Sequence, residues 1–206
     1  MSLPSTDSPG ARRRAWSRGS FLRIAAGTGG AVLGGLLVGH RVAGADASPS
    51  PAQDREIFRF ALLLEELQAA FYAEALERAG LTGDLRQFAQ VVGGHERAHV
   101  AFLRNVLGAT AGAPRSFHFG DATSDAQRFG AAARAIENIG VAAYNGQGAK
   151  LTAGAMEHAA EIVSVEGRHA GWIGALLGDP PAPRAADPGL EANAVLAQLK
   201  AGGYLA

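Results

Sequence analysis

A pattern of glutamate and histidine that occurs twice constrains this chain more than any other feature of its sequence. The segment GGHERAHVAFL contains Glu96 and His99, and the segment VSVEGRHAGWI contains Glu166 and His169. On an α-helix, residues three positions apart lie on the same face, so each glutamate and its histidine converge on one point. The pattern predicts two helices that present the same pair of side chains to a shared interior.

Each of these segments follows another segment of matching design. LEELQAAFY aligns without gaps on IENIGVAAY, so that Glu65 corresponds to Glu137 and Tyr72 corresponds to Tyr144. The distance from this first glutamate to the Glu-x-x-His motif is similar in both halves of the chain. The sequence therefore predicts two helical hairpins of the same design.

Hydrophobic residues recur with the helical period of 3.6 over four long segments, and no segment alternates with the period of two that marks a strand. The segment ATAGAPRSFHFGDATS, rich in glycine, proline and serine, predicts a long connection between the second and third helices. The fold class is all-α: a four-helix bundle with a long crossover and an internal hairpin duplication. The expected helices are Asp54–Ala79, Asp84–Leu107, Asp125–Asn145 and Thr152–Leu177, with Gly146 and Gly148 ending the third, and a short last helix over Glu191–Lys200.

The candidate site consists of carboxylates placed in the middle of apolar helix faces. A buried carboxylate is costly unless it is paired, protonated or bound to a cation. The chain has no cysteine, so a metal ion would have oxygen and nitrogen ligands. Two divalent ions would balance the charge; the alternative is a metal-free network of hydrogen-bonded glutamates and histidines. The predicted metal ligands are Glu65, Glu96, His99, Glu137, Glu166 and His169.

The first 47 residues have the order of an export signal: a basic start, an apolar run and small residues before a cleavage site. The stretch SRGSFLR is similar to the twin-arginine export motif, with Gly19 in place of the second arginine. We expect a signal over 1–47 cleaved near 45/46, a linker over 48–53, the bundle over 54–177, and a terminal loop and helix over 178–206. The expected location is the periplasm, the cell wall or the extracellular space; the alternative is an uncleaved signal that anchors the chain in a membrane.

Charge and composition exclude several other classes of function. Lysine plus arginine equals aspartate plus glutamate at 19 each, so no net field attracts nucleic acid, and we expect no nucleic-acid partner. The sequence has no nucleotide-binding motif and no serine, histidine and aspartate arrangement typical of a hydrolase. Metal chemistry in the bundle is the function class that these residues favour.

Residues 54–177 resemble a ferritin-like domain, specifically the exported bacterial branch that includes plant desiccation-related proteins. The segments LEELQAAFY, HERAH, IENIGVAAY and VEGRHAGW carry the resemblance. It implies metal ligation by the six residues named above. It also implies that Tyr72 donates a hydrogen bond near the metals and is the candidate catalytic residue; the alternative is that Tyr72 and Tyr144 are core aromatic residues with satisfied hydroxyls.

Several other polar residues have simpler interpretations. Gln68 stands where this branch usually has a second glutamate and is expected to face inward, which leaves the path of metal into the site in question. Glu66 shares a face with charged residues and is predicted to lie on the surface. His95 is predicted to lie at the rim of the ligand face, and His158 is grouped with it.

Three functions fit this set of residues. The first is a di-iron oxidase in which dioxygen or peroxide oxidises ferrous iron, and the second is a di-manganese catalase-like activity. The third is a non-enzymatic metal-binding or metal-free bundle that protects against stress such as desiccation. The expected cofactor is two iron ions, with two manganese ions or a mixed pair as alternatives. Besides metal ions and dioxygen or peroxide, the expected partner is the export machinery, and a homodimer is an assembly left open.

Overall fold

The structure is a computed structural model that describes residues 48–205. The predicted export signal over residues 1–47, and the alternative of a membrane anchor there, lie outside the described residues. Within residues 48–205, no helix combines the length and the apolar character needed to cross a membrane.

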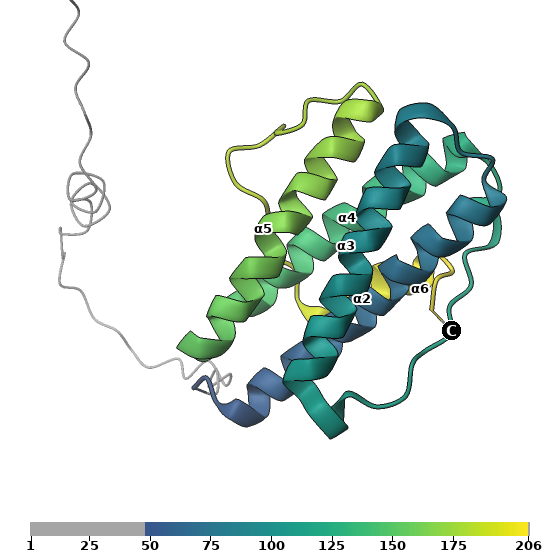
Figure 1. Cartoon of the computed structure of the whole chain (residues 1–206). Helices are drawn as coiled ribbons and strands as arrows, with labels where there is room; N and C mark the ends of the chain where they lie inside the picture. Colours follow the sequence, from purple (N-terminus) through teal and green to yellow (C-terminus); the bar gives the residue numbers. More distant parts are fainter. Residues whose placement is uncertain (1–47, 206) are drawn as a thin grey trace, which may run out of the picture. The chain divides into compact units, whose positions relative to one another are not determined.

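Four long helices form the body of the described domain, and Figure 1 shows them lying alongside one another. Neighbouring helices in the sequence pack as pairs: the first mainly against the second, and the third mainly against the fourth. Residues 48–205 contain helices and loops without a strand, so the predicted all-α class is confirmed. The four helices are α2 (Pro51–Arg78), α3 (Gly83–Leu107), α4 (Ala126–Gly148) and α5 (Ala153–Leu176).

A long crossover joins the two helical hairpins, as the sequence predicts. It follows α3 and contains two short 3-10 helices, η1 (Gly108–Ala111) and η2 (Gly120–Thr123). A second long connection after α5 leads to the short helix α6 (Ala192–Ala201), which packs against α4. This topology lets the two hairpins face each other with one side chain from each of four helices on a common axis.

The helix α2 begins earlier than the sequence predicts. The predicted linker over 48–53 is shorter, because α2 starts at Pro51, and Ser50 caps it by accepting a hydrogen bond from the Gln53 N–H at 3.3 Å. Proline fits the first helical position because its φ is already helical and its missing N–H would have no partner there. The other long helices begin and end within three residues of their predicted bounds.

An aromatic cluster fills one end of the bundle and fixes the ring of Tyr72. Phe71 stacks on Phe129 with ring centroids 5.5 Å apart, and Tyr72 meets Phe88 edge to face at 5.8 Å. All four of these side chains are 0% exposed. Because buried rings packed in this way have little freedom, the Tyr72 hydroxyl is held in one place in the interior.

Glu66 is not on the surface, and that prediction is wrong. Its side chain is buried and forms ion pairs with Arg104 on α3 and with Arg115 on the crossover. The crossover folds back over this face of α2, which the helical period alone does not reveal. Two guanidinium groups therefore compensate a carboxylate that the sequence pattern places among solvated residues.

The sequence predicts that the third long helix ends at Asn145, before Gly146. In the structure, α4 continues through Gly146 to Gly148. The loop after α5 crosses α4 at this point, and the Leu190 N–H donates a hydrogen bond to the Ala142 carbonyl at 2.8 Å. A Cβ atom on Gly146 would lie 2.0 Å from the Leu190 carbonyl oxygen. Glycine is therefore needed here for the close approach of two backbones rather than to break a helix.

We predict that Gly146→Ala destabilises the domain by about 1–3 kcal/mol or more, because the added methyl group meets a fixed backbone atom. Urea unfolding followed by circular dichroism measures this free energy. The control is Gly148→Ala, whose Cβ would lie 3.5 Å from the end of the flexible Met156 side chain, an ordinary contact. Equal stability of the two variants would contradict this account of the crossing.

Candidate metal centre

The six predicted ligands lie together in the middle of the bundle. Helices α2, α3, α4 and α5 each contribute one glutamate, and all four carboxylates are 0% exposed. The two histidines come from α3 and α5, one turn after the glutamates of those helices. The side chain of His169 is 3% exposed and that of His99 is 12% exposed, so His99 is the ligand nearest to solvent. The carboxylates are Glu65, Glu96, Glu137 and Glu166.

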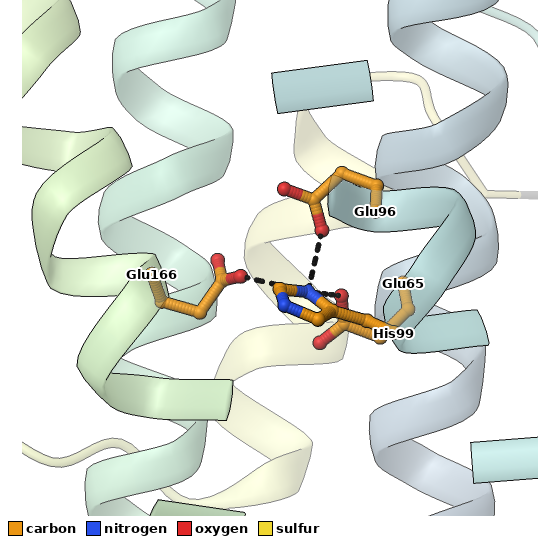
Figure 2. A group of neighbouring side chains, drawn as sticks. All are labelled: Glu65, Glu96, His99 and Glu166. Atoms are coloured by element: carbon orange, nitrogen blue, oxygen red, sulfur yellow. Dashed lines mark hydrogen bonds and ion pairs between the residues drawn. The ribbon is translucent and has the colours of Figure 1, made fainter. Parts of the chain in front are cut away.

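One group of ligands surrounds His99, and we call it the His99 position: Glu65, Glu96, His99 and Glu166. Figure 2 shows the imidazole between the three carboxylates, which come from three different helices. The Nδ1 atom of His99 lies 3.1 Å from Glu65 Oε2, 3.2 Å from Glu96 Oε2 and 3.3 Å from Glu166 Oε1.

The second group, the His169 position, consists of Glu96, Glu137, Glu166 and His169. The Nδ1 atom of His169 lies 3.0 Å from Glu96 Oε1, 3.3 Å from Glu137 Oε2 and 3.7 Å from Glu166 Oε1. Glu96 and Glu166 belong to both groups, while Glu65 and Glu137 each belong to one. This arrangement has two ends and a shared middle, as a dinuclear centre requires.

The donor atoms of these groups fit a cation. In each group, one ligand atom from every residue lies within 4.8 Å of the others. Four buried atoms of the site make no aligned hydrogen bond, namely Glu96 Oε1, Glu137 Oε2, Glu166 Oε1 and His169 Nδ1, although this nitrogen forms ion pairs with the three oxygens. Buried polar atoms are almost always satisfied, and carboxylate oxygen and imidazole nitrogen are ligands that iron and manganese accept. The residues present therefore fit a pair of divalent metal ions.

Two buried tyrosines connect the hairpins across the site. The Tyr72 hydroxyl on α2 donates to Glu137 Oε1 on α4 at 2.5 Å, and the Tyr144 hydroxyl on α4 donates to Glu65 Oε1 on α2 at 2.6 Å. Burial, with the nearby carboxylates, raises the pKa of both phenols well above the ordinary value, so both keep the proton that they donate. The Tyr72 hydroxyl thus contacts Glu137, one of the candidate ligands. A role of Tyr72 in catalysis stays a prediction.

Gln68 faces the site, as its position on the helix predicts. Its amide Nε2 donates to Glu137 Oε1 at 3.2 Å and to Glu166 Oε2 at 3.3 Å. The side chain is 2% exposed. The amide thus holds one carboxylate from each helix of the second hairpin, and it adds no negative charge to the site.

His95 has a partner in the site that the sequence interpretation missed. It is an exposed rim residue, as predicted, but its Nδ1 lies 2.9 Å from His169 Nε2, and the two rings stack with centroids 5.1 Å apart. The contact leaves His169 Nδ1 directed at the carboxylates. His95 is one helical turn before His99, and this spacing was the signal in the sequence that could have revealed it. His158 is also exposed, and its ring meets Phe102 rather than the site.

The close packing of acids and bases shifts the pKa values of Glu65, Glu166 and the two histidines. Burial raises the pKa of Glu65 to about 7, and repulsion from Glu96 adds to the shift. Burial and the charge of Glu65 raise the pKa of Glu166 to about 7. Burial lowers the pKa of the histidines, but their carboxylate partners outweigh it, and the pKa of His99 rises to about 12 and that of His169 to about 10. In the absence of metal, these glutamates and histidines therefore bind protons, and the protons supply the positive charge that metal ions would otherwise supply.

We predict that the metal-free protein loses stability as the pH rises from about 5 to about 9. Folding raises the pKa of Glu65 and Glu166 from 4.5 to about 7, so the folded chain holds protons that the unfolded chain has released. The contribution of these two glutamates to the free energy of unfolding is fully present below about pH 4.5 and is lost as the pH rises through 7. The two histidines act with the same sign above about pH 6.5.

Melting temperatures measured with a chelator at pH 5.5, 7.0 and 8.5 test this prediction. In the Glu65→Gln variant, the side chain at position 65 no longer titrates. The melting temperature of this variant should therefore fall less than that of the parent between pH 5.5 and 7.0. Glu161→Gln, on the exposed side of α5, is the matched control and should follow the parent. An identical slope in all three proteins would contradict the prediction.

Comparison with known protein families adds one finding. Residues 53–179 match the sequence model of a ferritin-like domain, and the match spans all four helices that contribute ligands. No curated protein matches the sequence.

Proposed function

Because this chain belongs to the family of ferritin-like domains, we propose that it is a dinuclear metal-carboxylate protein that binds two iron ions, with manganese as the alternative. The observation that carries the proposal is the convergence of four buried carboxylates and two histidines into two groups that share two glutamates. Such a set of ligands is the one used by di-iron and di-manganese bundles.

The ligands divide the work according to their positions. Glu96 and Glu166 belong to both groups, so they would help to hold both ions. Glu65 with His99, and Glu137 with His169, would each complete one end. Bound iron would supply electron transfer to dioxygen or peroxide, which no side chain of this site can supply.

The protein would contribute a buried, charged and rigid environment. Each carboxylate at an end of the site already accepts a tyrosine hydrogen bond through one oxygen and keeps the other oxygen for a ligand role. Complete burial of the four carboxylates keeps bulk water away from the ions. We propose that the biological role is oxidation of ferrous iron or protection against oxidative stress.

A metal-free structural bundle is the second candidate, and one observation favours it. The raised pKa values of His99 and His169 make both imidazoles cationic at neutral pH, and they lie among the four carboxylates. The network could therefore balance much of its own charge without metal. In this case the protein would bind no ion and would act through its stability, as a protein of desiccation stress would.

Anaerobic loading with ferrous iron, followed by oxygen, separates the two candidates. An oxidase should give rapid ferric absorbance, and Glu96→Ala should slow it to the rate in buffer, because both metal positions lose a shared ligand. The control is Glu161→Ala, an exposed glutamate of α5, which should behave like the parent. Equal rates in the parent, Glu96→Ala and plain buffer would contradict the oxidase function.

We also propose that the protein is exported, on the basis of the signal-like residues 1–47. Export predicts a mature protein outside the cytoplasm that begins near Asp46, as read by N-terminal sequencing of the exported fraction. Replacing Arg18 with Gln should reduce that fraction if the twin-arginine route is used. A full-length protein found in the cytosol would contradict export.

A further inference from the structure

The two halves of the site are not equivalent, although the sequence that makes them is duplicated. In the alignment of the two hairpins, Glu65 falls on Glu137 and Tyr72 falls on Tyr144, and Gln68 falls on Gly140. A Cβ atom on Gly140 would lie 3.0 Å from Glu166 Oε2 and 3.5 Å from the Gln68 amide. The glutamine of one hairpin therefore occupies the space that the glycine of the other leaves free.

This replacement gives the two terminal carboxylates different support. Glu137 Oε1 accepts hydrogen bonds from Tyr72 and from Gln68, at 2.5 and 3.2 Å. On the opposite side, Glu65 Oε1 accepts one from Tyr144 at 2.6 Å, and Gly140 has no side chain with which to add a second. Apart from contacts with the site histidines, Glu137 thus has two hydrogen-bond donors and Glu65 has one, and the other oxygen of Glu137 lies 3.3 Å from His169 Nδ1.

The two positions also differ in whether their candidate ligand atoms already make aligned hydrogen bonds. In the His169 position, one atom from each residue makes no aligned hydrogen bond, and His169 Nδ1 meets the three oxygens only as an ion pair, the nearest being Glu96 Oε1 at 3.0 Å. In the His99 position, by contrast, the His99 Nδ1 atom already makes hydrogen bonds with Glu65 Oε2 and Glu96 Oε2 (Figure 2). A metal ion that enters the His99 position must replace these aligned hydrogen bonds, whereas one that enters the His169 position replaces ion pairs whose atoms are not aligned for hydrogen bonding.

His95 adds to the same difference. It contacts His169 Nε2, the ring nitrogen opposite the ligand atom, and so fixes the orientation of that imidazole. A partner of this kind on a histidine ligand commonly changes metal affinity by about 10- to 100-fold. Within residues 48–205, the hydrogen bonds of the His99 ring are all made by Nδ1, to site carboxylates, so its orientation has no such external support.

We infer that the two metal ions bind in sequence, the first at the His169 position and the second at the His99 position, and that Gln68 and His95 set this order. This inference rests on the proposed dinuclear function. It assigns to Gln68 and His95 the role of positioning residues: they act on the metal through Glu137, Glu166 and His169 without touching it.

Titration of the metal-free protein with Mn²⁺ tests the order. Calorimetry should give two steps whose dissociation constants differ by about tenfold or more. Electron paramagnetic resonance should show an isolated-ion signal up to one equivalent and its loss through magnetic coupling as the second equivalent binds.

A matched pair of variants identifies which position fills first. His99→Ala should retain one tight equivalent of Mn²⁺ with the isolated-ion signal. His169→Ala should lose the tight step. If the two variants lose affinity equally, or if His169→Ala keeps the tight step, the assigned order is wrong.

Two further variants test the positioning residues. Gln68→Leu keeps a buried side chain of similar length but donates no hydrogen bond, and it should weaken the first step by about 10-fold or more while changing the second step less. His95→Ala should do the same, and His118→Ala, an exposed histidine of the crossover, should not. Circular dichroism confirms that each variant is folded, and unchanged first steps in folded Gln68→Leu and His95→Ala would overturn their roles.

The outcomes also separate this inference from the proposed function. Two equivalents bound with equal affinity in the parent would contradict the order and leave the dinuclear site intact. No binding of Mn²⁺ or Fe²⁺ by the parent would overturn both. Two unequal steps without any reaction with oxygen would support the order and contradict the oxidase activity.

Discussion

Burial of four carboxylates on one axis is the constraint on which the rest of this structure depends. Removing a single carboxylate from water costs several kcal/mol even after the protein relaxes, and here four are 0% exposed within one bundle. Every polar group around them reduces that cost: two tyrosine hydroxyls, one glutamine amide and two imidazoles. Even so, three of the carboxylate oxygens and His169 Nδ1 make no aligned hydrogen bond, and a bound cation would satisfy all four atoms.

The duplicated hairpin is an economical way to build such a centre. Each hairpin supplies one terminal glutamate, one shared glutamate, one histidine and one tyrosine, and each tyrosine binds the terminal glutamate of the other hairpin. The two halves therefore depend on each other, because each terminal glutamate takes its tyrosine hydrogen bond from the other hairpin. The departure from symmetry at Gln68 and Gly140 gives Glu137 an amide hydrogen bond for which Glu65 has no counterpart.

Periodicity predicts which face of a helix is buried, and for that reason the four helices and the clustering of the six candidate ligands could be predicted from the sequence. Periodicity does not predict which residues of other helices or loops contact a side chain at the border between the buried and exposed faces of a helix. The helical period predicts Glu66 on the surface. It cannot show that two arginines cover this glutamate, because one comes from another helix and the other from the crossover. The same limit hid His95, which faces solvent on its own helix and reaches His169 on another, and Gly146, which is needed by a loop that returns from far along the chain.

The metal content of the full chain tests the central claim most directly. The protein would be purified without chelators beside the double variant Glu96→Ala, Glu166→Ala, which removes both shared carboxylates, and both would be measured by elemental analysis. We predict about two equivalents of iron or manganese per parent chain and none in the variant. Absence of metal from both proteins, even after anaerobic reloading, would contradict it and would mean that the buried carboxylates form a network sustained by protons alone.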